Sequence, residues 1–359
     1  MNRSRWYAWV QRAWYERAPG FQLLLPLSWL YRLAVAVRRG CYRLGIFRQR
    51  VLPAPVIVIG NLVAGGAGKT PVTLFLAQAL KEKGLKPGIV SRGYGREDDT
   101  LLVEVAAGDA ADEVGDEPLL LARRSGCPVV VGRDRVTAAR RLLQRGVDVI
   151  LADDGLQHYR LARDFELCVV DAERGFGNGC LLPAGPLREP LSRLLTVDSI
   201  LLNGAAGKDN DRDHASLARL RQRGIRFSLT AENAERLDGS ARRPLTEFAG
   251  RTVHAIAGIG NPERFFRLLR SFGVRCVEHP LADHARIDEF ELERMTRTAT
   301  DSAGEHDIFM TEKDAVRLGD ASSERLWAVP VDLVMEPSTA AALIREVVAS
   351  CERKQESSA

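Results

Sequence analysis

The sequence GNLVAGGAGKT, residues 60–70, ends as a phosphate-binding loop does but does not begin as one. The common pattern G-x-x-x-x-G-K-[ST] requires a glycine five positions before Gly68, and this chain has Val63 there. The last six residues match a variant pattern, G-G-x-G-K-[ST], without the lysine that precedes the variant in other proteins. In such loops the lysine reaches the β- and γ-phosphates of a nucleotide, and the next hydroxyl coordinates Mg²⁺. Lys69 and Thr70 are predicted to do so here.

The segments on both sides of the loop favour this interpretation over a chance glycine-rich turn. The apolar run VIVI at 56–59 is typical of a strand buried on both faces of a parallel sheet. Apolar residues then recur at helical spacing over 72–80, with Pro71 in the first turn and Gly84 after the end. Between a strand and a helix, backbone N–H groups and the helix N-terminus face one anion. The residues predicted to contact the nucleotide are Val63, Ala64, Gly65, Gly66, Ala67, Gly68, Lys69 and Thr70.

An aspartate pair follows another apolar run, in VDVILADDG at 147–155. A carboxylate at the carboxyl end of a strand lies at the crevice where α/β sheets bind ligands, beside the phosphates. Asp153 and Asp154 are therefore predicted to hold the metal ion, although the sequence does not decide which of them touches it. The alternative is that two aspartates before a glycine only form a turn.

Strand and helix patterns alternate along most of the chain. Further apolar runs stand at 88–90, 128–132, 147–151, 166–170 and 198–202, with arginine-rich helical stretches between them. The alternation predicts an α/β fold, a P-loop NTPase-like doubly wound parallel sheet over residues 51–205. Residues 206–250 are polar and are predicted to form a linker region. The alternation then restarts, which predicts a second, smaller α/β domain over 251–359, with GIGNPE at 258–263 as a strand-to-helix turn.

The amino-terminal segment, residues 1–50, differs in charge from the rest of the chain. It holds ten arginines, no lysine and one acidic residue, a net charge of +9, so the other 309 residues carry −5 of the total +4. Four of the five tryptophans and four of the six tyrosines also lie there, around the apolar run FQLLLPLSWLYRLAVAV at 21–37. Arginine mixed with Trp and Tyr is typical of a bilayer interface, which we favour over nucleic-acid binding.

The apolar run does not fit a membrane span or a cleavable signal peptide. Its 17 residues include Pro26 and Arg32 and are near the lower limit for crossing a bilayer. The sequence VRRGCYRLG follows where a small-residue cleavage site would stand. We therefore expect a helical segment that lies on the cytoplasmic face of a membrane, as in a peripheral, monotopic protein. The alternative is a helix that docks on the protein's own core.

Cysteine spacing excludes two classes of site. The chain has six cysteines and no C-x-x-C pair, which argues against a zinc site or a disulfide framework and fits a reducing compartment. A composition of 45% apolar and 27% charged residues is that of an ordinary globular protein.

The run DDGLQHYRLARDFELCVVDAERGFGNGCLLPAGPLREP, residues 153–190, resembles the tetraacyldisaccharide 4'-kinase family of lipid A biosynthesis. Shorter segments that resemble the family in the same order are IGNLVAGGAGKTP, SRGYG, GDEPLLLARRSGCPVVVGRDR, AGIGNPERFF and TEKDAVR. Together they cover residues 55 to 335 approximately. The resemblance implies a kinase that uses ATP and Mg²⁺ to phosphorylate the 4'-hydroxyl of a tetraacylated glucosamine disaccharide 1-phosphate at the bacterial inner membrane. It implies no protein partner and no nucleic acid.

The resemblance also implies roles for individual residues. Asp116 of GDEP would be the base that accepts the hydroxyl proton, and Glu117 would help to bind the metal. The alternative for Asp116 is a helix N-cap before EPLLLARR. His284 of LADHARID matches the family's histidine that pairs with the base. Ala285 and Arg286 stand where many members carry a second histidine and an aromatic residue, so this local match is looser.

Several arginines are candidates for binding phosphate, because the guanidinium fork bonds two oxygens at once. Arg188 with Glu189, in PLREP, resembles a pair of the family near the nucleotide, and we count Arg188 with Lys69, Asp116 and His284 as catalytic. Asp314 in TEKDA is given no role beyond positioning a domain. The substrate candidates are Arg92 and Tyr94 in SRGYG and Arg133 and Arg135 in GRDR.

A second function remains open at this point: a membrane-associated P-loop ATPase switch that delivers a cargo. The variant loop suits it. The missing lysine before the glycine pair and the stretch GFGNGCLLPAGPLREP do not.

Overall fold

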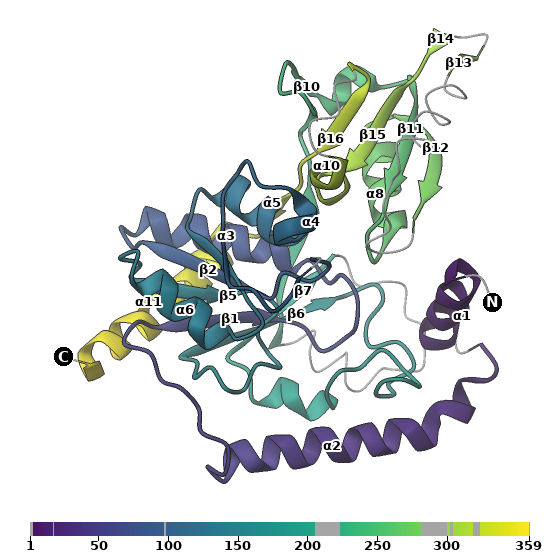
Figure 1. The fold of residues 1–359 in the computed structure, drawn as a ribbon. Helices are drawn as coiled ribbons and strands as arrows, with labels where there is room; N and C mark the ends of the chain where they lie inside the picture. The colour runs from purple at the N-terminus through teal and green to yellow at the C-terminus, as the bar shows by residue number, and fades with distance from the viewer. Residues whose placement is uncertain are drawn as a thin grey trace.

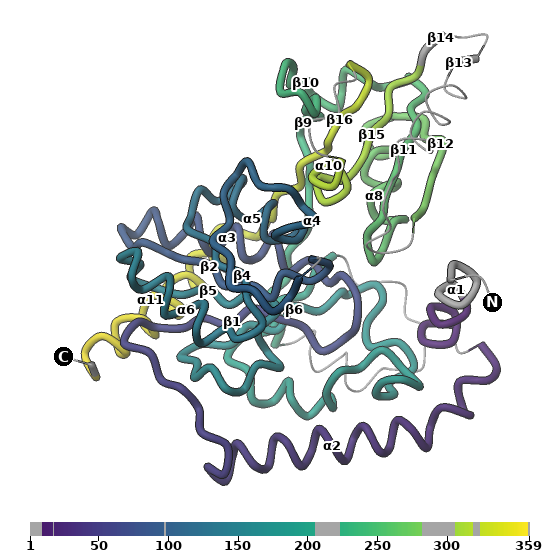
Figure 2. The backbone as a smooth tube through the Cα atoms, viewed as in Figure 1, coloured from purple at the N-terminus to yellow at the C-terminus, as the bar shows by residue number. Residues whose placement is uncertain are grey.

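The computed structural model describes residues 3–16, 18–96, 98–204, 223–281, 300–301, 304–318 and 324–358. Two β-sheets organise these residues into two adjacent α/β domains (Figure 1). The backbone trace shows the chain passing from the first domain into the second and back again (Figure 2). The P-loop NTPase-like fold predicted from the sequence is thus confirmed.

The first sheet has the strand order β17-β8-β7-β6-β1-β5-β2-β4-β3. Its inner strands are parallel, and the edge strands β3 and β17 are antiparallel to their neighbours. The apolar runs found in the sequence form β1, β2, β4, β5, β6 and β7, which are buried along their whole length. The strands are β1 (Val56–Gly60), β2 (Pro87–Ser91), β3 (Val103–Val105), β4 (Val129–Val131), β5 (Val149–Ala152), β6 (Phe165–Asp171), β7 (Ser199–Asn203), β8 (Ile225–Thr230) and β17 (Asp332–Val334).

Helices cover both faces of this sheet, as a doubly wound fold requires. On one face, α3, α5 and α11 bury apolar side chains such as Leu76, Leu121 and Leu343 in one core. On the other face, α6 contributes Val136 and Leu142 to a second core. The helices of this domain are α3 (Lys69–Glu82), α4 (Ala111–Val114), α5 (Asp116–Ser125), α6 (Arg135–Leu143), η2 (Leu191–Leu195) and α11 (Pro337–Ser358).

The second sheet has the order β10-β9-β16-β15-β11-β12. Helix α8 packs on one face through Phe265, Phe266 and Leu269, and α10 packs on the other through Ala315 and Leu318. The elements are β9 (Asn233–Arg236), β10 (Arg242–Pro244), η3 (Leu245–Phe248), β11 (Thr252–Ala257), α8 (Pro262–Ser271), β12 (Arg275–Pro280), β15 (Asp307–Thr311), α10 (Glu312–Leu318) and β16 (Leu326–Val329), with β13 (Thr300–Asp301) and β14 (Gly304–Glu305) paired separately.

Strand pairing moves the domain boundaries expected from the sequence. Residues 225–244, within the expected linker 206–250, include β8 of the first sheet and β9 and β10 of the second. After β16 the chain returns, because β17 pairs with β8 and α11 buries Leu343 and Val347 beside α3. Residues 332–358 therefore complete the first domain instead of ending the second.

Two helices precede the first sheet, α1 (Arg3–Tyr15) and α2 (Leu25–Arg43), with η1 (Phe21–Leu24) between them. Helix α2 lies along the outside of the first domain (Figure 1). One side of it is attached, since Ser28 Oγ donates to the Leu181 carbonyl over 2.7 Å and Tyr31 Oη donates to the Arg188 carbonyl over 3.0 Å. Among the described residues, no helix combines the length and apolar character that crossing a bilayer requires.

Candidate functional site

The glycine-rich loop connects β1 to α3 at the centre of the first sheet. Gly65 and Gly68 have φ of 109° and 93°, a backbone region that favours glycine. Two amide side chains fix the loop: Asn61 Nδ2 donates to the Gly65 carbonyl over 3.1 Å, and Asn203 Nδ2 donates to the Ala67 carbonyl over 3.0 Å. The loop is therefore held open from both sides, as a phosphate cradle requires.

The first two predicted contacts, Val63 and Ala64, are occupied elsewhere. Ala64 N–H donates to the Pro186 carbonyl over 2.8 Å, and Val63 is buried and bridges to Leu187. This geometry does not support nucleotide contacts for these two residues. It attaches the base of the loop to the segment that carries Arg188.

Asp154 joins the loop to that arginine. It follows β5, the strand next to β1, as predicted. Lys69 Nζ lies 3.5 Å from Asp154 Oδ1, and Arg188 Nη1 lies 3.0 Å from both carboxylate oxygens. Burial opposes ionisation of Asp154, but Lys69, Arg188 and Arg135 outweigh it and hold its pKa well below its usual range. Its φ of 47° is unusual for a residue with a side chain, a strain found at functional turns.

Asp153 is the aspartate whose surroundings fit a cation. Its side chain is fully buried, and Oδ1 lies 3.2 Å from Thr73 Oγ1, whereas Oδ2 has no hydrogen-bond partner among the residues that the structure describes. Burial and the nearby Glu117 carboxylate raise the pKa of Asp153, and together they outweigh the opposing effects of Lys69 and of the Thr73 hydrogen bond. A buried carboxylate oxygen of this kind is a ready ligand for Mg²⁺.

The substrate candidates fall into two groups. Arg135 is buried, and its Nη2 donates to the carbonyls of Asp153 and Asp154 over 3.3 and 2.9 Å. It therefore holds the backbone of the two aspartates, which we call the aspartate turn. Arg92, Tyr94 and Arg133 are exposed. The SRGYG loop packs next to Asp116, because a Cβ at Gly115 would stand 3.3 Å from the Gly93 Cα and from the Tyr94 carbonyl oxygen.

Asp116 and Glu117 begin α5, but Asp116 does not cap it. Gly115 occupies the N-cap position and has no side chain with which to cap the helix. The Asp116 carboxylate is buried and instead contacts Arg317 of the second domain, whose Nε lies 3.0 Å from Oδ2. Lys313 Nζ, also from the second domain, lies 2.9 Å from Glu117 Oε1. The predicted partner of Asp116, His284, lies outside the described residues.

A cavity of about 360 Å³ lies between the two domains. Residues 66–71 of the loop, Asn203 and Glu117 line it from the first domain, and residues 259–261 and 311–313 line it from the second. Apolar side chains complete the wall at Leu74, Leu120, Leu229, Ile259, Phe265, Leu268, Val329 and Val331. A space with a phosphate loop at one end and apolar walls beyond it is suited to a nucleotide.

Ion pairs on the β6 side of the cavity tie the domains together. Arg264 Nη2 of α8 lies 2.9 Å from Asp171 Oδ1, and Arg267 Nη2 lies 2.6 Å from Glu173 Oε2. Arg174 donates to the Gly260 carbonyl and lies over the Tyr15 ring of α1, with 3.8 Å between the guanidinium carbon and the ring centroid. The loop after β6 thus connects the amino-terminal helix, the first domain and the second.

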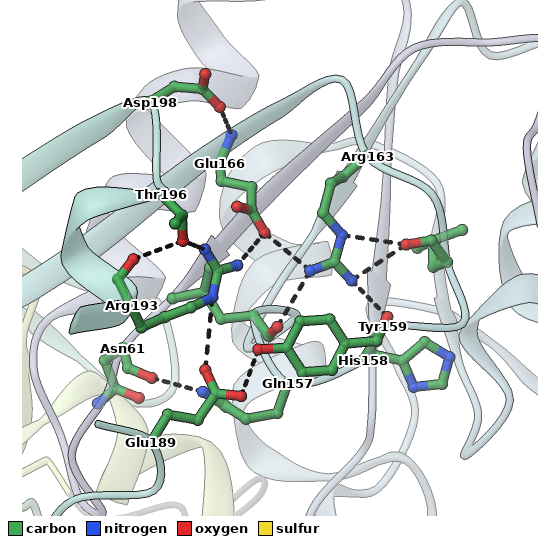
Figure 3. Close-up of polar contacts among 12 residues, drawn as sticks. Asn61, Gln157, His158, Tyr159, Arg163, Glu166, Glu189, Arg193, Thr196 and Asp198 are labelled. Carbon is green, nitrogen blue, oxygen red and sulfur yellow. Dashed lines mark hydrogen bonds and ion pairs between the residues drawn. The ribbon is translucent and has the colours of Figure 1, made fainter. Parts of the chain in front are cut away.

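A buried polar network supports the segment beside Arg188 (Figure 3). Glu189 accepts a hydrogen bond from Tyr159 Oη, and Arg193 pairs with Glu166. Arg163 Nη1 donates to the same Glu166 oxygen over 2.8 Å. Burial and the neighbouring Glu189 raise the pKa of Tyr159 to about 12, so its hydroxyl stays a donor at any physiological pH. The network fixes the backbone that positions Arg188.

Several of these residues were missed by sequence reasoning. Asn203 had a local signal, because it is a polar residue directly after the buried run SILL, like Asp153 after its own strand. Lys313 and Arg317 stand in the segment TEKDAVR, but no local signal pointed to their contacts with Glu117 and Asp116, which are distant in sequence. The same holds for Arg174 and its contact with Gly260.

The loop between a central strand and a helix, with an aspartate pair on the adjacent strand, defines the P-loop class of nucleotide-dependent proteins. The family model described as tetraacyldisaccharide-1-P 4'-kinase matches residues 21–349. The chain is 41% identical over 348 residues to the tetraacyldisaccharide 4'-kinase of Nitrosococcus oceani, covering 96% of each chain. It is 45% identical over 340 residues to that of Dechloromonas aromatica, covering 92% of this chain and 94% of the relative. The chain therefore belongs to the tetraacyldisaccharide 4'-kinase family, phosphotransferases of lipid A biosynthesis.

A solved structure shares the fold over nearly the whole chain. LpxK from Aquifex aeolicus, determined in complex with ATP, superposes with a TM-score of 0.71 at 27% sequence identity, covering 92% of this chain and 99% of that one. The switch ATPase considered from the sequence finds no support in these comparisons, because the family model and the curated relatives described here are kinases.

Proposed function

We propose that this chain transfers the γ-phosphoryl group of ATP, with Mg²⁺, to the 4'-hydroxyl of a tetraacylated glucosamine disaccharide 1-phosphate at a membrane surface. One observation carries the proposal: the interdomain cavity brings the glycine-rich loop, Lys69 and Glu117 to one place. Phosphoryl transfer needs positioning and charge neutralisation more than covalent chemistry, and these residues supply both.

The loop and two cations bind and orient the phosphates. Backbone N–H groups of residues 65–70 and the N-terminus of α3 cradle the triphosphate, and Lys69 contacts its terminal groups. Lys69 and Arg188 both flank Asp154, which keeps the two cations in place before the substrates arrive. The guanidinium of Arg188 bonds phosphate oxygens of the nucleotide or the lipid.

The residues fit Mg²⁺. The Thr70 hydroxyl, the Asp153 carboxylate and Glu117 would hold the ion. No group of three or more His, Cys, Asp or Glu side chains arranged for a metal occurs in the described part of the chain. When bound, Mg²⁺ neutralises charge that develops on the transferred phosphate.

Asp116 accepts the proton of the attacking hydroxyl. The residue is buried, lies at the start of α5 and adjoins Glu117, which lines the cavity. The SRGYG loop beside it offers Arg92 and Tyr94 to the sugar or its phosphate. His284 would pair with Asp116 and adjust its basicity.

Helix α2 holds the enzyme at the headgroup depth where an acylated substrate stays. The side of α2 that faces away from the protein exposes Leu27, Trp29, Leu30, Leu33 and Val37, with exposed fractions of 56–65%. Arg32 and Arg43 are also exposed on this helix. An apolar face bordered by arginines suits a helix that lies in the interface of the cytoplasmic leaflet of the inner membrane.

The decisive assay gives the purified full chain γ-labelled ATP, Mg²⁺ and the tetraacylated disaccharide 1-phosphate in mixed micelles. We expect label on the lipid, and a phosphorus NMR spectrum of the product places it at the 4' position.

Lys69→Ala should abolish transfer, whereas Lys83→Ala, an exposed lysine near the end of the same helix, should not change it. Asp116→Ala should lower kcat about 10²-fold or more while the Kd for ATP stays the same. Release of free phosphate without labelled lipid would instead indicate the ATPase switch.

A further inference from the structure

Helix α10 of the second domain reaches the cavity with its first residues. Glu312 and Lys313 line the cavity together with Thr311, the last residue of β15, and the helix lies between the second sheet and helices α4 and α5 (Figure 1). Two further residues of the helix, Asp314 and Arg317, stand one turn apart and form an ion pair of 3.0 Å. Neither belongs to the nucleotide site described above.

Asp314 holds the glycine loop of the second domain. Its side chain is fully buried, and Oδ2 accepts hydrogen bonds from Gly258 N–H over 2.8 Å and from Thr311 Oγ1 over 2.6 Å. Gly258 begins the loop 258–261, and Gly260 of that loop packs directly against Gly66 of the phosphate loop. Asp314 therefore sets the position of a backbone segment that touches the nucleotide cradle.

Arg317 holds Asp116. Its Nη1 contacts Asp314 Oδ1, while Nε and Nη2 both contact Asp116 Oδ2 across the domain boundary. The arginine side chain is 11% exposed and the Asp116 side chain 6% exposed, so solvent screens this contact little. One guanidinium thus connects a carboxylate that holds the glycine loop to the carboxylate assigned as base.

We propose that Asp314 and Arg317 are positioning residues that couple the nucleotide loops to the orientation of Asp116. The inference rests on the proposed function of Asp116. Gly260 of the second domain packs on the phosphate loop, and through this contact the Asp314–Arg317 pair orients the Asp116 carboxylate towards the place where the sugar hydroxyl binds. The guanidinium suits this task because its planar fork fixes two directions at once, which an ammonium group cannot do.

The physical reason lies in the cost of a misplaced group. A reacting group displaced by about 1 Å can lower a rate about 10²-fold. Asp116 is the first residue of α5, so its backbone is fixed, but its side chain needs a partner to select one rotamer. Loss of Arg317 should therefore lower kcat without changing how the triphosphate is cradled.

The test compares Arg317→Ala with the wild-type full chain in the lipid phosphorylation assay. We expect kcat to fall about 10- to 100-fold, and the Kd for ATP, measured by calorimetry, to change less than about threefold, well within one decade of affinity. Arg317→Lys should recover part of kcat, because it restores the charge but not the fork. Arg270→Ala is the matched control, since Arg270 forms exposed ion pairs with Glu263 and Glu278 of the second domain and should leave kcat unchanged.

A double-mutant cycle separates positioning from general damage. If Arg317 acts through Asp116, Arg317→Ala should have no further effect on kcat in an Asp116→Asn background. Equal losses in both backgrounds, or a wild-type kcat for Arg317→Ala, would overturn the inference. Should Arg317→Ala not fold, Arg317→Lys replaces it in the same cycle. If Asp116→Asn itself has wild-type turnover, the proposed role of Asp116 fails first, and the two failures are thereby distinguished.

Discussion

Gly260 of the second domain lies against Gly66 of the phosphate loop so closely that a Cβ at position 260 would stand 2.6 Å from the Gly66 nitrogen. Real side chains do not tolerate this distance to a backbone atom. The GIGNPE turn is therefore more than a connection between β11 and α8, because its glycine allows the two domains to meet at the nucleotide cradle.

Gly260→Ala should separate the two loops and weaken nucleotide binding. We expect the Kd for ATP to rise about tenfold or more, because the second domain forms one wall of the cavity and the new methyl group displaces it. Titration calorimetry with ATP and Mg²⁺ measures this. Gly108→Ala is the control, since a Cβ there meets none of the described residues within 4 Å and the residue has no positive φ. Equal affinities for the two variants would show that the contact does not shape the site.

The exposed apolar face of α2 gives a prediction about the membrane. Replacing Leu30 and Leu33, which are 63% and 61% exposed, with glutamate should lower binding to anionic lipid vesicles about tenfold or more. Co-sedimentation of the full chain with the vesicles measures the change, and the Kd for ATP should stay the same. Val277→Glu, a 41% exposed apolar position on β12, is the control. Undiminished sedimentation of the α2 variant would place the membrane contact elsewhere.

The network in Figure 3 predicts where the fold is sensitive to a single charge. Arg193→Met should lower the free energy of unfolding by about 3–5 kcal/mol, because Glu166 loses a buried partner and Glu189 a nearby cation. Arg145→Met removes an exposed partner of Glu104 and should cost about 0.5 kcal/mol or less. Urea denaturation measures both. Similar values for the two variants would mean that water compensates the buried carboxylates.

The parts of the site that could be predicted from sequence are those that short patterns specify. The phosphate loop, Asp153 and Asp154 each stand next to a buried apolar run, and the parallel sheet brings the carboxyl ends of such runs together. The Asp116–Arg317 pair joins residues 201 positions apart, and no local pattern encodes it. The expected role of Asp116 came from family resemblance alone, and its local environment suggested only a cap.

The domain boundaries expected from the sequence differ from those that the strand pairing gives, for a related reason. The pattern of β17 and α11 is that of any strand followed by a helix, so sequence order assigned both to the second domain. Their real place is decided by the pairing of β17 with β8 and by the fit of Leu343 and Val347 beside α3. Such long-range choices depend on which surface offers a free edge and an apolar face.

The lowered pKa of His158 gives a prediction about how the free energy of unfolding depends on pH. Burial and the charge of Arg135 lower the pKa of His158 from 6.5 to about 4 in the folded chain. Between these two pH values the unfolded chain binds more protons, so this residue lowers the free energy of unfolding as the pH falls from about 6.5 towards 4.

His158→Gln should remove that contribution. The wild type should therefore lose stability relative to the variant between pH 6.5 and 4.5, and the difference between the two should be constant from pH 7 to 8, where the imidazole is neutral in both states. Urea denaturation at a series of pH values measures the difference. The raised pKa of Asp153 changes stability with pH in the opposite direction. Because Asp153 is present in both proteins, its contribution cancels in the difference between them. Parallel stability curves over the whole range would contradict this prediction. They would mean that His158 has the same pKa in the folded and unfolded chain, so that neither burial nor the charge of Arg135 lowers it.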